Sequence, residues 1–143
     1  MMHAWILVAN RSEAKLFAKR GFGTAPRLIR ELQHPEGRLH ARDIDTDRPG
    51  RTFDGRGAGR HAYTSNPKGH HAEIFAKELS TLLDRGMHAS SFRSLIIIAE
   101  PQMLGLIRGS VHQKTAASVV SWVGKDLPGV RESQVDELVS ETV

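Results

Sequence analysis

Two short runs of the sequence are almost entirely apolar, and they constrain the fold more than any other feature. Trp5–Ala9 reads WILVA and is bounded by Asn10 and Ser12, and Ser94–Ala99 reads SLIIIA. Apolar runs of this length without alternation are typical of strands that are covered on both faces. We therefore expect Trp5–Ala9 to lie in the centre of a sheet and Ser94–Ala99 to be the strongest strand of the chain.

Three other segments are predicted to be strands. Ala14–Ala18 and Arg27–Leu32 are separated by a short Gly- and Pro-containing stretch, which favours tight turns and a meander at the start of the chain. Ser118–Val123 is rich in β-branched residues and predicts a further strand near the end.

Helical periodicity begins at Glu73, and its apolar side chains recur at a spacing close to 3.6 residues. Asn66 and Pro67 could supply the cap and first turn of this helix, and Gly86 is expected to end it. Shorter helices are predicted from Pro101 to about Gly109 and over Glu132–Val139, the latter with Val135, Leu138 and Val139 facing inward. The outer face of the long helix is expected to carry Glu73, Lys77, Glu78 and Asp84. The residues expected in the core include Ile74, Leu79, Leu83, Met103 and Trp122.

Together these elements predict one mixed α/β domain over residues 1–143, with a sheet of about five strands flanked by helices. A chain of 143 residues can bury one core without help from disulfides or metals. It contains no cysteine, which excludes a disulfide framework and thiolate metal sites. No apolar run approaches the ~20 residues that span a bilayer, and the N-terminal run is too short for a signal-peptide core. We therefore expect a cytoplasmic protein without a membrane segment.

A long segment at about residues 34–70 has no helical or strand period, and loops of that length are usually functional or disordered. From Arg48 to His71 it holds five Lys or Arg against one Asp, a formal charge of +4 that equals the net charge of the whole chain. Concentrated positive charge favours a polyanionic partner. The residues predicted to bind a nucleic acid or another anion are Arg48, Arg51, Arg56, Gly57, Gly59, Arg60, His61, Lys68, His70 and His71.

The alternation of glycine and arginine explains why phosphate is the expected ligand. Glycines let the backbone approach a phosphodiester closely, and guanidinium groups bind its oxygens in bidentate fashion. Phe53 and Tyr63 could stack on unpaired bases. Neither the P-loop pattern nor the dinucleotide-binding pattern is present, since the position three after Gly57 is Arg60. A solvated loop without a partner is the alternative.

Metal sites and catalytic sites are predicted only weakly by the same segment. Asp43, Asp45, Asp47 and Asp54 have the spacing of a calcium loop, but its turn glycine is replaced by Arg48. His40, His61, His70 and His71 could gather around a transition metal, yet no His-Glu-x-x-His spacing occurs. Ser65, His61 and Asp54 could form a catalytic triad, but Gly-x-Ser-x-Gly is absent. The sequence thus predicts no metal, no cofactor and no catalytic residue.

Five stretches taken in order resemble the bacterial host-attachment protein family across nearly the whole chain. They are WILVANRSEAKLF, GRTFDGRGAGRHA, FAKELSTLLDRG, LIIIAEPQMLGLIRG and VGKDL. That family looks like a single-domain relative of the middle domain of archaeal and eukaryotic release factors and of Pelota. The resemblance implies a mixed sheet flanked by helices.

In release factors, a Gly-Gly-Gln loop before the long helix promotes hydrolysis of peptidyl-tRNA. The matching region here reads Gly55-Arg56-Gly57-Ala58-Gly59, and the four glutamines of the chain all lie elsewhere. We therefore expect no release activity. What the resemblance leaves is a basic glycine-rich segment able to enter an RNA-lined cavity.

Three hypotheses of function follow. The first is a non-enzymatic binder of structured RNA or ribosomes. The second is a hydrolase of an ester or phosphate bond that uses His61, His70 or His71 as general base. The third is a protein-interaction module whose loop orders on a protein partner. The family name implies a role in attachment, which we expect to be indirect because no adhesin feature is present. The sequence does not indicate an oligomeric state.

Overall fold

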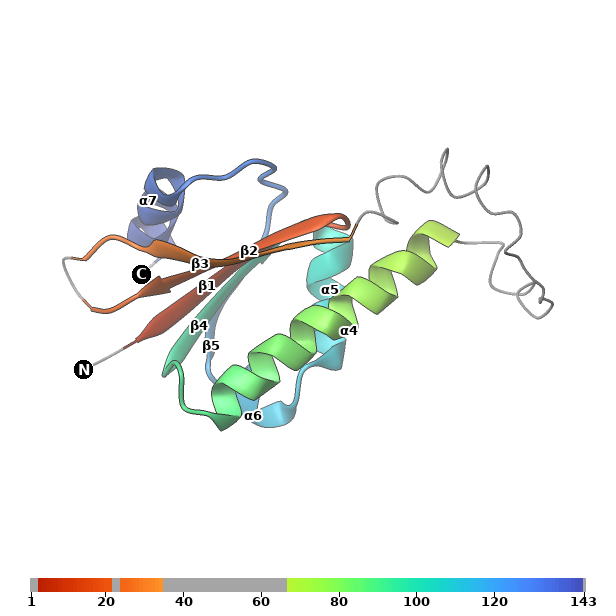
Figure 1. The fold of residues 1–143 in the computed structure, drawn as a ribbon, viewed down its shortest axis with the longest axis horizontal. Coiled ribbons are helices and arrows are strands. Elements are labelled where there is room, and N and C mark those ends of the chain that lie inside the picture. Colours follow the sequence, from red (N-terminus) through yellow and green to blue (C-terminus); the bar gives the residue numbers. More distant parts are fainter. Residues whose placement is uncertain (1–2, 22–23, 35–66, 143) are drawn as a thin grey trace.

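The computed structural model describes residues 3–21, 24–34 and 67–142. They form a five-stranded sheet in the order β3-β2-β1-β4-β5, with helices on both faces (Figure 1). The strands are β1 (Ala4–Ala9), β2 (Glu13–Lys19), β3 (Arg27–Gln33), β4 (Ser94–Ala99) and β5 (Val119–Gly124). The helices are α4 (Pro67–His88), α5 (Pro101–Ser110), α6 (Gln113–Ala117) and α7 (Glu132–Thr142).

The sheet is mixed, as the sequence predicted. β1, β2 and β3 form an antiparallel meander, whereas β1 pairs in parallel with β4 and β4 in parallel with β5. The predicted central position of the first apolar run is confirmed, because β1 is the third of the five strands.

The apolar runs are buried on both sides for the expected reason. In β1, Leu7 belongs to the core under α4 and α5, while Ile6 and Val8 belong to the core under α7. In β4, Ile97 and Ile96 divide between the two cores in the same way. Full burial of each such side chain contributes about 1.5–3 kcal/mol, so the central pair of strands anchors both layers.

The long helix α4 covers one face of the sheet together with α5 and α6 (Figure 1). Its residues Phe75, Leu79 and Leu83 are fully buried in that core. Pro67 is the first residue of the helix, where its fixed φ and missing N–H are tolerated, as expected.

The expectation that Gly86 ends this helix is wrong, because α4 continues to His88. A Cβ at Gly86 would lie 2.5 Å from Cζ3 of Trp5 and 3.0 Å from Cε2 of Phe92. Glycine is therefore present at this position so that the helix can lie against the Trp5 ring, and not because the helix stops.

On the opposite face, α7 packs through Val135 and Val139, with Val130 buried just before it. The amine of Lys15 donates to the carbonyl of Val130 at 3.0 Å, which fixes the chain before α7 to β2. Leu138 packs against the same core, so the inward face predicted for this helix is confirmed.

Three expectations about individual side chains need correction. Ile74 is 39% exposed, because it lies on the outer side of α4. Trp122 is only half-buried, and the guanidinium of Arg108 lies 5.0 Å from its ring centroid. Asp84 does not face solvent: its Oδ1 accepts hydrogen bonds from the His112 backbone N–H at 3.0 Å and from the Thr115 hydroxyl at 2.6 Å. Those contacts hold α6, a short helix that the sequence did not predict.

Candidate functional site

The predicted anion-binding residues are divided between two parts of the chain. Lys68, His70 and His71 belong to the first turns of α4. The side chain of His70 is exposed and that of His71 is half-buried. The remaining predicted residues lie outside the described residues; they are Arg48, Arg51, Arg56, Gly57, Gly59, Arg60 and His61.

The described residues on either side of positions 35–66 meet in a cluster that we call the loop root: His34, His70, His71, Phe75 and Glu78. His34 follows β3, and the other four lie on α4. The ring centroids of His34 and His71 are 6.0 Å apart, and those of His70 and His71 are 6.2 Å apart. The structure thus brings the end of β3 and the start of α4 together, and these are the elements that residues 35–66 connect in the sequence.

His34 is the centre of the loop root, and the sequence did not single it out. Its side chain is buried and stacks on Phe75 with a centroid distance of 5.0 Å and an interplanar angle of 14°. Its Nδ1 lies 3.8 Å from Oε1 of Glu78, one helical turn after Phe75. The spacing of 71, 75 and 78 on one helix face was the available signal, but nothing in the sequence placed residue 34 against that face.

A tight turn between β1 and β2 holds the other side of His34. Oδ1 of Asn10 accepts from the backbone N–H groups of Ser12 and Glu13 at 2.9 and 3.0 Å. The backbone N–H of His34 donates to the carbonyl of Ser12 at 2.7 Å. The end of β3 is therefore fixed by the hairpin as well as by α4.

Further polar residues beyond the ends of β1, β4 and β5 contact one another. Nε of Arg11 lies 3.6 Å from Oε1 of Glu100, and the same carboxylate oxygen caps α5 by accepting from the N–H of Met103 at 2.8 Å. The side-chain amide of Asn10 donates to Asp126 at 3.3 Å. These contacts tie β1 to the chain segments after β4 and β5, and their function is structural.

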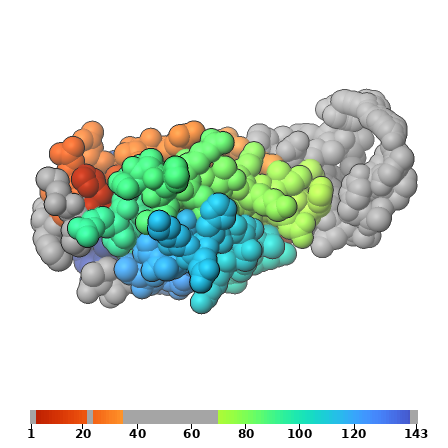
Figure 2. All heavy atoms as spheres, turned by 90° about the horizontal axis from the view of Figure 1, so that it is seen from below, coloured from red at the N-terminus to blue at the C-terminus, as the bar shows by residue number. Residues whose placement is uncertain are grey.

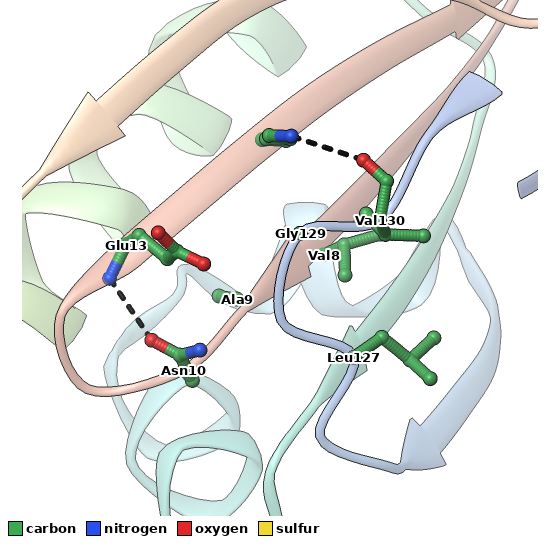
Figure 3. Close-up of a pocket in the computed structure, with 8 residues that line it drawn as sticks. Val8, Ala9, Asn10, Glu13, Leu127, Gly129 and Val130 are labelled. Carbon is green, nitrogen blue, oxygen red and sulfur yellow. Dashed lines mark hydrogen bonds between the residues drawn. The ribbon is translucent and has the colours of Figure 1, made fainter.

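The small cavity in Figure 3 does not provide a ligand site. It lies between the end of β1 and residues 127–130, and its volume is about 10 Å³. Such a space accommodates at most one water molecule. The Lys15 amine and the Val130 carbonyl close one side of it with their hydrogen bond.

Within the part of the chain that the structure describes, no group of three His, Asp or Glu residues could hold a metal ion. The aspartates of the calcium-like spacing, and His40, His61 and Ser65, lie outside the described residues. No helix among residues 3–21, 24–34 and 67–142 is long and apolar enough to cross a membrane.

Two solved structures of archaeal proteins have a similar fold. A crystal structure of the archaeal translation termination factor aRF1 matches with a TM-score of 0.54 and 13% identity, over 99% of this chain and 35% of that protein. A second structure, described as an archaeal protein, matches with a TM-score of 0.53 and 12% identity, over 97% of this chain and 34% of that one. The chain thus spans about a third of the length of each, and at these identities the likeness concerns the fold.

A family match is also found, although none of the curated proteins compared with the chain matches it. Residues 5–139 match the family described as "Protein required for attachment to host cells". This match runs from β1 to α7 and includes the loop root. The chain therefore belongs to the family of proteins required for attachment to host cells.

Proposed function

We propose that this protein binds structured RNA or the ribosome through the basic segment Arg48–His71 and does not act as an enzyme. The observation that carries the proposal is the charge of this segment, +4 within 24 residues, while the rest of the chain is neutral on balance. The phosphate groups of a nucleic acid are the expected ligands of such a sequence. Arg51, Arg56 and Arg60 suit these groups because a guanidinium can form bidentate hydrogen bonds with phosphate oxygens.

The fold supports the proposal by the position of this segment. Most of it lies in the sequence between β3 and α4, at the place where the resemblance to release factors puts their Gly-Gly-Gln loop, and its last five residues begin α4. The described fold is similar to about a third of a translation termination factor. Because Gly-Gly-Gln is absent, we propose that binding occurs without hydrolysis.

The loop root supports the proposal in a second way. His34 and α4 are both held by contacts that do not involve the predicted arginines. Replacement of those arginines should therefore change binding without unfolding the domain. An effect on attachment would then be indirect, through the translation of surface components in the cytoplasm.

The test is co-sedimentation of the full chain with ribosomes and with tRNA, with and without nuclease treatment. We expect association with RNA or ribosomes that is lost in the variant with Arg51→Ala, Arg56→Ala and Arg60→Ala. The matched control replaces Arg27, Arg93 and Arg131, which are exposed and lie outside the basic segment. Since both variants lose three positive charges, equal losses of binding would contradict a local site.

Two other outcomes would support the alternatives. A protein partner that persists after complete nuclease digestion would favour the interaction module. Hydrolysis of an ester or phosphate substrate that is lost in the His61→Ala, His70→Ala or His71→Ala variant would favour the hydrolase.

A further inference from the structure

An open groove of about 820 Å³ runs between α4 and the edge strand β3. Figure 2 shows the orange β3 region alongside the green α4 on this side of the molecule. The residues that matter for its chemistry are Trp5, Arg30, Leu32, Glu78, Leu82 and Arg85. The lining residues all belong to the described part of the chain, and none of them is a residue of the basic segment.

One wall of the groove is an edge of the sheet. Among the described residues β3 is the terminal strand of the sheet, its one pairing partner is β2, and it is exposed over most of its length. Ile29 is 50% exposed and Leu28 is 39% exposed. The N–H of Leu28 is already bound by Oε2 of Glu132 at 2.8 Å, so the stretch available for pairing begins after Leu28. An exposed edge of this kind can pair with another extended chain.

Two arginines give the groove its charge. Arg30 lies on β3 and Arg85 lies on α4, and neither forms an ion pair with a carboxylate among the described residues. Glu78, in contrast, lies 3.8 Å from His34. Glu31 also borders the groove. In the sheet register it is paired with Lys15, so the two side chains lie on the same face of the sheet, and the Lys15 amine is on the α7 side. With Glu31 turned to the α7 side, α4 and β3 present two arginines and one glutamate, Glu78, to the groove, which is one positive charge in excess.

The floor of the groove is apolar. Leu32 and Leu82 are half-buried, and Trp5 packs against Phe92 with a centroid distance of 4.8 Å. The combination of a sheet edge, a facing helix and an apolar floor is the arrangement by which peptide-binding domains add a strand from a partner.

We propose that this groove binds an extended acidic segment of a partner protein, which adds to β3 as a further strand. Alternate side chains of an added strand point to the same face. Acidic side chains on the face of α4 would meet Arg30 and Arg85, and apolar side chains at other positions of that same face would contact Leu82. A peptide is favoured over RNA because an RNA strand would leave the backbone donors and acceptors of β3 unpaired. The proposal is independent of RNA binding, since it uses none of the residues of the basic segment.

The test is a titration of the isotope-labelled full chain, followed by amide NMR, with capped nonapeptides in which glutamate and leucine take turns at every second position and threonine stands between them. Two control sets carry lysine for every glutamate or proline at the central position, which removes a backbone donor. We expect shifts at the amides of residues 29–33 and at those of Leu82 and Arg85. Binding should weaken at least tenfold for both control sets.

Charge reversal sharpens the test. The Arg30→Glu, Arg85→Glu variant should prefer the lysine peptides, and the Arg30→Gln, Arg85→Gln variant should bind acidic and lysine peptides equally. Both arginine side chains are exposed, so their replacement leaves the core intact. The Arg51→Ala, Arg56→Ala, Arg60→Ala variant should bind the acidic peptides unchanged. Absence of binding by all acidic peptides, equal binding of acidic and basic peptides, shifts confined to other elements, or displacement of a bound peptide by tRNA would each overturn the proposal.

Discussion

The two ends of α4 are held in different ways, and the difference separates the structural part of this protein from its candidate functional part. At the C-terminal end, Gly86 lies against Trp5 and Phe92, and Asp84 binds the start of α6. At the N-terminal end, His34 and Phe75 form one stacked contact, and the basic segment joins the helix there. The C-terminal contacts join α4 to Trp5, Phe92 and α6, whereas the N-terminal contact joins it to His34, next to the segment that we propose for binding.

The largest expected effect is at the packed end. Gly86→Ala should destabilise the protein by about 1–3 kcal/mol, because the added methyl group overlaps the Trp5 ring. Denaturant unfolding of the variant and the parent measures this. Adding Trp5→Phe should recover part of the loss, since the shorter ring removes the overlapping atoms. A Gly86→Ala variant as stable as the parent would show that the close approach has no energetic consequence.

Loss of the α6 contacts should have a smaller effect. Asp84→Ala leaves the His112 N–H and the Thr115 hydroxyl without their acceptor, and we expect a cost of about 1–2 kcal/mol. Asp84→Asn keeps an oxygen acceptor and is the matched control. Hydrogen exchange should show faster opening confined to residues 112–118, and uniform acceleration along α4 would contradict this local role.

At the loop root, the free energy of unfolding can be compared between variants of two histidines, His34 and His70. His34→Ala should cost about 1 kcal/mol through loss of the stack on Phe75. His70→Ala, at an exposed position, should stay within about 0.5 kcal/mol of the parent. Thermal unfolding of the two variants distinguishes them, and equal stabilities would mean that the loop root is not anchored by His34.

The smallest effect on stability is expected in the basic segment. Replacing Arg51, Arg56 and Arg60 by alanine should change the free energy of unfolding by less than about 0.5 kcal/mol per site if these side chains are kept for binding. Chemical denaturation checks this. A large loss of stability would mean that the arginines are part of the packed structure.

The strands, the helices and the mixed sheet could be predicted from the sequence, but the contacts at the packed end of α4 could not. Apolar runs such as Ser94–Ala99 indicate buried strands directly, and the periodicity of α4 indicates its buried face. Gly86 and Asp84 were misjudged because their roles depend on Trp5 and Thr115, which are distant in the sequence. No local sequence pattern identifies the residue that a side chain will contact in the folded structure.

The candidate site was predicted in part. Composition identified the basic segment, and Asn66 and Pro67 indicated where α4 could begin. The structure places Lys68, His70 and His71 in the first turns of this helix, and their role in binding stays a prediction. His34 and the groove beside β3 were missed, since both depend on how the end of one strand meets a helix more than thirty residues later. The residues of segment 48–61 lie outside the described residues, and their role stays a prediction.

The central claim is that the charge of the basic segment is available to phosphate. Filter binding of tRNA to the parent and to the Arg51→Ala, Arg56→Ala, Arg60→Ala variant, across a series of salt concentrations, tests it most directly. The parent should bind with an affinity that falls steeply with salt, and the variant should bind more weakly with a slope of log K against log salt that is smaller by about 2–3, because each phosphate contact contributes about 0.7–0.9. Equal slopes for the two proteins, or an affinity that does not respond to salt, would contradict the claim.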